Sequence, residues 1–253
     1  MPQLMRTSNP ALNDRVFRGQ PMASYGESMT VQGTVNKTGV LLLLAMLTAA
    51  YTWHLSYSGN VLAVMPLMWV GLIGGMIAAF VTMFKMNWAP VTAPVYALFE
   101  GLALGGISAV FDMRFHGIAF EAVCLTFGVM FVLLLAYKSG MIRVTQKFRL
   151  GVIAATGAIF LFYFVEMILG FFHIGLGAVG AVNGSGAIGI GFSLLVVGIA
   201  ALNLVLDFDF IERGAQASAP KYMEWYGAFG LMVTLVWLYL EILNLLAKLQ
   251  SRD

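Results

Sequence analysis

Seven long apolar stretches run along this chain, separated by short groups of polar or helix-breaking residues. A helix needs about 20 predominantly apolar residues to cross the hydrocarbon core of a bilayer. Seven segments reach this length: Thr38–Tyr57, Val61–Phe84, Pro90–Phe111, Ile118–Tyr137, Leu150–Phe171, Ala187–Leu206 and Trp225–Ala247. The pattern predicts an all-α, polytopic membrane protein, in which seven transmembrane helices form a bundle in the lipid bilayer.

The composition excludes several classes of protein. Hydrophobic residues make up 60% of the chain and charged residues 10%, whereas soluble domains carry about 25% charged residues. The net charge of +2 gives no indication of a nucleic-acid partner. Cys124 is the single cysteine, so an internal disulfide and a thiolate metal cluster are excluded. The sequence has no HExxH, GxSxG or Walker loop motif, and we expect neither an enzyme nor a cofactor.

Basic residues are distributed unevenly between the two sides of the predicted bundle. Cytoplasmic segments of membrane proteins carry an excess of lysine and arginine. Eleven basic residues fall on the side of the N-terminus, against Arg114, Lys248 and Arg252 on the other: Arg6, Arg15, Arg18, Lys37, Lys85, Lys138, Arg143, Lys147, Arg149, Arg213 and Lys221. We therefore expect an integral protein of a bacterial inner membrane, with a cytoplasmic N-terminus and the C-terminus outside. Residues 1–37 would form a flexible cytoplasmic tail, and residues 38–250 the transmembrane domain.

Acidic side chains at membrane depth give the strongest functional lead, because a charge surrounded by hydrocarbon is costly and usually functional. Glu100 lies near the middle of the third predicted span. Asp207 and Asp209 close the sixth span, and Asn203 lies one turn before Asp207 on the same helical face. These residues are candidates for an ion pathway.

The seventh span holds the acidic residue that is hardest to explain. Glu241 has apolar residues on both sides, and Asn244 follows it on the same helical face. An isolated charge at this depth needs a proton or a partner. Structural interpretations remain open: Asp207 could be a solvated helix end, and Glu241 or Glu100 could be a protonated carboxyl that packs against another helix.

Asp207 and Glu241 lie on consecutive predicted helices. They can face each other if the seventh helix begins well inside the cytoplasm or bends. Two carboxyl groups that share one proton titrate as a unit, which is the chemistry of a pH-sensitive latch. Their oxygens also suit Ca²⁺, a hard cation that takes carboxylate and carbonyl ligands. We expect the two residues to form a pH sensor and to be the candidate Ca²⁺ ligands.

Three segments resemble the Bax inhibitor family, also called the transmembrane Bax inhibitor motif family, and most closely its bacterial branch. They are APVYALFEGLALGGIS at 93–108, NLVLDFD at 203–209 and EWYGAFGLMVTLVWLYLE at 224–241. Together with the number and orientation of the spans, the resemblance covers about residues 38–250. It implies a compact bundle in which six helices surround a central seventh, and a pH-sensitive Ca²⁺ leak across the membrane.

The resemblance also implies roles for particular residues. In the channel-like members of the family, two aspartates in the last two spans form the sensor, assisted by an arginine near the cytoplasmic end of the second span. Asp207 matches the first aspartate and Glu241 stands where the second would be. Lys85 stands near the arginine position, although lysine lacks the bidentate geometry of arginine.

Two functions from different classes follow. The first is a pH-sensitive Ca²⁺ leak channel gated by protonation of the acidic pair, with Ca²⁺ as the transported ion. The second is a non-conducting regulator that binds a membrane protease or another integral membrane protein, as some bacterial relatives are thought to do. Ca²⁺ movement through purified protein in liposomes distinguishes the two.

The predicted orientation can be tested with topology reporters. A reporter fused after Asp253 should read as outside the cell, and one inserted between Lys138 and Arg149 should read as cytoplasmic, because basic loops stay on the cytoplasmic side. A cytoplasmic signal from the C-terminal reporter would favour six spans with a re-entrant last segment.

Overall fold

The computed structural model describes residues 28–58, 61–172 and 177–252. These residues form α-helices and one short 3₁₀ helix. The elements are α1 (Val31–Tyr57), α2 (Val61–Phe84), η2 (Met86–Trp88), α3 (Ala89–Arg114), α4 (Ile118–Lys138), α5 (Gln146–Phe171), α6 (Gly177–Asn183), α7 (Ala187–Gln216) and α8 (Met223–Gln250). All except α6 and η2 are long and apolar enough to cross a membrane, which confirms the predicted bundle of seven transmembrane helices.

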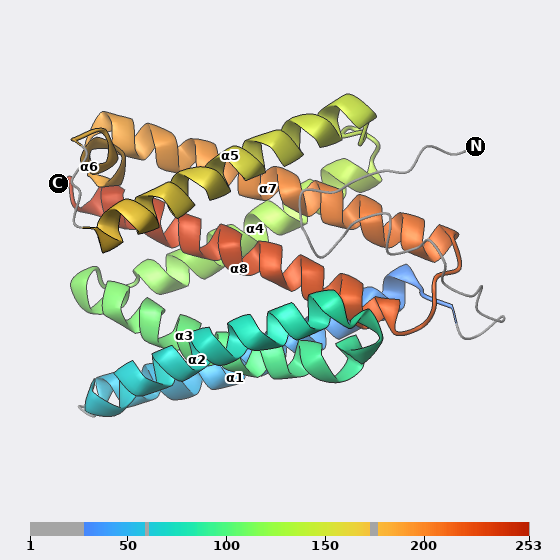
Figure 1. The fold of residues 1–253 in the computed structure, drawn as a ribbon, viewed down its shortest axis with the longest axis horizontal. Coiled ribbons are helices and arrows are strands. Elements are labelled where there is room, and N and C mark those ends of the chain that lie inside the picture. The colour runs from blue at the N-terminus through green and yellow to red at the C-terminus, as the bar shows by residue number, and fades with distance from the viewer. Residues whose placement is uncertain (1–27, 59–60, 173–176, 253) are drawn as a thin grey trace.

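α8 is the central helix of the bundle. It is the most buried of the seven long helices and contacts α1, α3, α4 and α7. In Figure 1, α8 runs through the middle, with α1, α2 and α3 on one side and α5 and α7 on the other. The surrounding ring is uneven, because α2 packs chiefly on α1 and α3, and α5 packs chiefly on α7.

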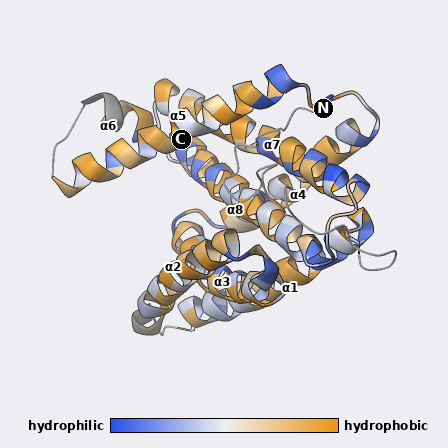
Figure 2. Ribbon diagram, turned by 45° about the vertical axis from the view of Figure 1, so that its right-hand side comes forward, coloured by the Kyte–Doolittle hydropathy of each residue, from blue (hydrophilic) through white to orange (hydrophobic). Residues whose placement is uncertain are grey.

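The two ends of the bundle differ in charge. We call one end the basic end: there α1 begins and a short loop joins α7 to α8, and it holds Lys37, Lys85, Arg149, Arg213 and Lys221. The opposite end, called the distal end, holds α6 and the C-terminus of α8 (Figure 1). Figure 2 shows hydrophilic residues at the helix ends and loops, and predominantly apolar residues along the helices.

Several helices extend beyond the spans that the hydropathy pattern predicts, and α1 and α7 extend furthest. α1 begins at Val31 rather than Thr38, because Thr30 caps it by accepting a hydrogen bond from the backbone N–H of Gly33 at 2.9 Å. α7 continues ten residues past Leu206, through a charged stretch whose side chains are paired. Residues 31–37, predicted as part of a flexible tail, therefore form the first turns of α1. Residues 1–27 lie outside the described residues.

Small residues hold α1, α2 and α3 together. A Cβ atom added to Gly101 or Gly105 of α3 would overlap the backbone of Ala45 or Ala49 in α1. A Cβ at Gly71 of α2 would overlap the backbone of α3 in the same way. Close approach through small residues is the usual source of helix association in lipid, where burial supplies little driving force.

The contact between α1 and α3 gives a first stability prediction. Gly105→Ala should destabilise the protein by about 1–3 kcal/mol, because backbone atoms of Ala49 must move to admit the methyl group. Gly128→Ala in α4 is the matched control, since a Cβ there meets no atom within 4 Å, and alanine favours a helix. Thermal unfolding of both variants in detergent would check this. Equal melting temperatures would contradict the packing role.

Candidate functional site

Asp207 lies on α7 in the half of the bundle nearest the basic end, and its side chain is 0% exposed. Every residue from Asn203 to Phe208 is buried, so α7 is enclosed on all sides at this depth. One turn before Asp207, the Asn203 amide donates to Thr156 Oγ1 at 2.8 Å and to the Ile199 carbonyl at 2.9 Å. The predicted polar face of Asn203 and Asp207 therefore points into protein and not into lipid.

An ion cluster follows Asp207 by half a turn. Asp209 accepts a hydrogen bond from Arg149 of α5 at 2.6 Å and another from Arg213 Nε at 3.1 Å. Arg149 is buried at the start of α5, with 3% of its side chain exposed. A buried arginine of this kind ties two helices together, because neither charge is stable at this site without the other.

The basic partners of the acidic segment differ from the predicted one. Lys85, proposed from its place at the end of the second span, is exposed between α2 and η2. Arg149 and Arg213 lie beside the acidic residues instead. Arg149 was predicted as part of a basic loop. Its role depends on α5 beginning at Gln146, which brings the arginine into the first turn of a helix packed on α7.

Glu241 lies in the distal half of α8 and is 7% exposed. Tyr163 of α5 donates its hydroxyl to the two carboxylate oxygens at 3.1 and 3.3 Å, and Trp237 Nε1 donates at 3.2 Å. A carboxyl among apolar helices thus has two polar partners from aromatic side chains. Asn244, on the next turn of α8, is half-buried.

The structure does not bring Asp207 and Glu241 together. α7 and α8 are antiparallel, and Asp207 lies nine residues before Gln216 whereas Glu241 lies 18 residues after Met223. At about 1.5 Å per helical residue, their depths from the basic end differ by about 13 Å. The expected hydrogen-bonded pair and shared Ca²⁺ site are therefore absent from this conformation. Among the described residues, no group of three or more histidine, cysteine or acidic side chains could hold a metal ion.

Glu100 belongs to a third location. It lies on α3 beside Gly75 of α2 and interacts with the Tyr96 hydroxyl one turn earlier. Glu100 thus lies at the contact between α2 and α3, away from Asp207 and Asp209 of α7. The three acidic positions at membrane depth therefore occupy three different parts of the bundle.

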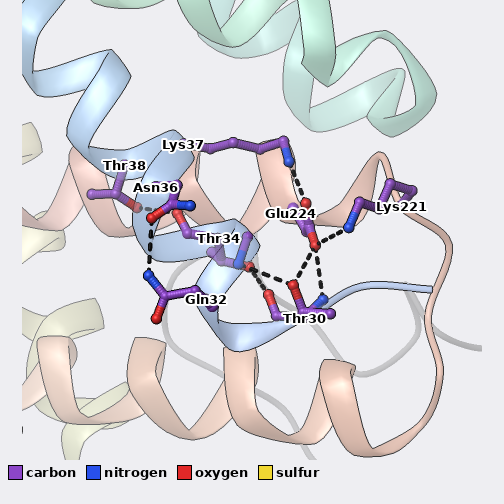
Figure 3. Close-up of polar contacts among 9 residues, drawn as sticks. Thr30, Gln32, Thr34, Asn36, Lys37, Thr38, Lys221 and Glu224 are labelled. Carbon is purple, nitrogen blue, oxygen red and sulfur yellow. Dashed lines mark hydrogen bonds and ion pairs between the residues drawn. The ribbon is translucent and has the colours of Figure 1, made fainter. Parts of the chain in front are cut away.

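The best-partnered carboxylate is one that sequence reasoning did not select. Glu224, in the first turn of α8, is fully buried and accepts from the Thr30 backbone N–H at 2.9 Å and the Thr30 hydroxyl at 2.8 Å. Lys221 Nζ donates at 2.8 Å and Lys37 forms an ion pair with the other oxygen. Figure 3 shows these donors around the carboxylate. Thr30 and Glu224 are 194 residues apart in the chain.

Backbone contacts reinforce this cluster, which we call the Glu224 knot (Thr30, Lys37, Lys221 and Glu224). The Met29 N–H donates to the Ala219 carbonyl at 2.6 Å, and Ser28 forms an isolated β-bridge with Pro220. The start of α1 is therefore fastened to the loop between α7 and α8. No local sequence signal marks this contact, since its partners come from opposite ends of the chain.

Comparison with known proteins assigns the family. The family model described as Bax inhibitor 1 like matches residues 9–251. The chain belongs to the Bax inhibitor 1-like family. Searches of curated proteins and of solved structures found no significant match. The family assignment agrees with the seven spans and makes this a Bax inhibitor-like membrane protein, of a family linked to Ca²⁺ leak.

The Glu224 knot yields a stability prediction with a matched pair of variants. A Cβ at Gly33 would overlap the Glu224 carboxylate, which could move away only by losing its hydrogen bonds. Gly33→Ala should therefore reduce the free energy of unfolding by about 1–3 kcal/mol, which is measured as a lower melting temperature in detergent. Gly39→Ala, on the same helix with no atom within 4 Å of the new methyl, should leave it unchanged or slightly raised.

A second variant tests the charge of Glu224 without introducing a steric clash. Glu224→Gln keeps the shape but leaves Lys37 and Lys221 without a negative partner, so it should also lower the melting temperature. Glu121→Gln, an exposed glutamate of α4, is its control. If Gly33→Ala and Gly39→Ala have the same melting temperature, the Glu224 knot does not stabilise the fold.

Proposed function

We propose that the protein is a Ca²⁺-permeable leak of the membrane, whose conduction depends on protonation of Asp207 and Glu241. The observation that carries the proposal is the complete burial of Asp207 within a long apolar helix. A carboxyl group at this depth is costly to retain, and intramembrane acidic residues are found in ion pathways and proton relays. Membership of a family linked to Ca²⁺ leak supports the same conclusion.

The two acidic residues act as separate stations in this proposal. The basic end faces the cytoplasm, following the excess of basic residues there. Asp207 then belongs to the cytoplasmic half and Glu241 to the outer half, about 13 Å apart along the axis. A hard cation that enters from either side meets one carboxylate before it crosses the middle. The acidic pair is functional in this view, and direct contact between its members is not required.

Protonation supplies the gate. A carboxylate attracts Ca²⁺, whereas the protonated acid has lost that charge and becomes a hydrogen-bond donor. At Asp207 the change also alters the charge balance beside the Arg149–Asp209–Arg213 cluster, which ties α5 to α7. At Glu241 it alters the contacts with Tyr163 and Trp237. Both changes therefore affect contacts of α5, at Asp209 on α7 and at Glu241 on α8.

The test is Ca²⁺ flux into liposomes that contain purified protein and a trapped Ca²⁺ indicator, at several pH values between about 5 and 8. Wild-type flux should depend on pH. Asp207→Asn and Glu241→Gln fix one station each in a neutral form. Each variant should therefore hold, at every pH, the flux that the wild type shows at the acidic end. Glu121→Gln should keep the wild-type profile, because this glutamate is exposed in the first turn of α4.

Two outcomes would contradict the proposal. Unaltered pH profiles in both amide variants would show that the two carboxyls do not gate conduction. Absence of Ca²⁺ movement, with an ionophore proving that the indicator responds, would exclude a leak. The protein would then be better described as a non-conducting regulator that binds a membrane protease or another integral membrane protein.

A further inference from the structure

A buried lysine lies at the distal end of the bundle. Lys248 lies in the last turns of α8 and is 7% exposed. Its ammonium group donates to the Val182 carbonyl at 2.9 Å, to Ser193 Oγ at 2.9 Å and to the Gly189 carbonyl at 3.4 Å. An ammonium has three N–H donors, and here each has an oxygen acceptor.

The shell of oxygens around Lys248 has the composition of a cation site. Two backbone carbonyls and one hydroxyl converge on the nitrogen, and no carboxylate is among these contacts. Glu241 and Glu166 interact with Lys248 electrostatically but are not among its hydrogen-bond partners. Neutral oxygens suit a cation of single charge, because a divalent ion needs anionic ligands to offset its loss of hydration.

The three acceptors come from the corner between α6 and α7. Val182 is in the last turn of α6, and Gly189 and Ser193 are in the first two turns of α7. Asn183 fastens the same corner to α5 by donating its amide to Glu166. The corner is tight, because a Cβ at Gly189 would overlap the Gly184 carbonyl. Lys248 therefore binds the corner to the end of the central helix.

Glu241 lies on the same helix as Lys248. It precedes Lys248 by seven residues, which places both on the same face of α8, about two helical turns apart. On this face of α8, the ammonium of Lys248 is thus the charged group that follows Glu241 toward the distal end.

We propose that Lys248 is a tethered cation, which fills a monovalent cation site formed by Val182, Gly189 and Ser193 and closes the distal end over Glu241. The assignment stands on the coordination of the ammonium alone and does not require that the protein conduct Ca²⁺. Removal of the lysine side chain should leave a site that accepts a free alkylammonium ion or K⁺. It should also increase the access of water to Glu241.

The first experiment is chemical rescue. Lys248→Ala should melt at a lower temperature than the wild type in detergent, and propylammonium, which replaces the missing side chain, should restore the loss. Tetramethylammonium at equal ionic strength has no N–H donor and should not. Lys138→Ala, which removes an exposed lysine from the end of α4, should show neither effect. Equal stabilisation of wild type and Lys248→Ala by propylammonium would overturn the cation site.

Ser193→Ala keeps the ammonium and removes one acceptor, so it tests the same site if Lys248→Ala fails to fold. Its melting temperature should fall, and propylammonium should not restore it. A melting temperature equal to that of the wild type would contradict the oxygen shell.

The closure is tested separately by labelling a cysteine with a water-soluble thiol reagent. Asn244→Cys, in a chain that carries Cys124→Ala, places the thiol between Glu241 and Lys248 on α8. Labelling should be faster when Lys248→Met is added, and unchanged when Lys138→Met is added instead. Equal rates in all three proteins would show that Lys248 does not close this end. The result does not depend on Ca²⁺ flux.

Discussion

Every charged group inside this bundle must find its partner within the protein, because the surrounding hydrocarbon offers neither water nor counter-ions. The positions of several helices depend on that requirement. Arg149 fastens α5 to α7 through Asp209, and Tyr163 fastens α5 to α8 through Glu241. Glu224 fastens the start of α1 to the start of α8. Removal of one member leaves a buried charge without compensation, which destabilises more than loss of an apolar contact.

The two sides of α8 are held by different physical means. On one side, α1, α2 and α3 approach through Gly71, Gly101 and Gly105, where backbone meets backbone. On the other side, α5 reaches the bundle mainly through α7, and hydrogen bonds from Arg149, Thr156 and Tyr163 connect it to α7 and α8. Close backbone packing resists separation along its whole length, whereas a polar tie can be released by one proton. Movement of α5 relative to α7 and α8 is therefore easier to couple to pH than movement within the α1–α3 group.

The sequence predicts the spans well and the site less well, for separable reasons. Hydrocarbon thickness sets helix length, so the apolar stretch Val61–Phe84 predicts the bounds of α2 without error. Hydropathy does not predict the end of α7. The helix continues past Asp207 to Gln216 because Arg149 of α5 neutralises the charge of Asp209. The expected contact between Asp207 and Glu241 depends on how deep α7 and α8 lie relative to each other, and composition does not encode this. The partners of Glu224 and Lys248 are distant segments or backbone carbonyls, and neither leaves a local pattern.

The region between Asp207 and Glu241 is apolar on both α7 and α8. At the depths between Asp207 and Glu241, α7 presents Ala200 and Leu204, and α8 presents Leu235 and Leu238, all buried. Removing the hydration shell of a divalent cation here would cost far more free energy than contacts with apolar side chains could offset. The present arrangement is therefore closed to such a cation between Asp207 and Glu241. Under the proposed function, Ca²⁺ conduction past Asp207 and Glu241 requires α7 or α5 to move away from α8 far enough to admit water.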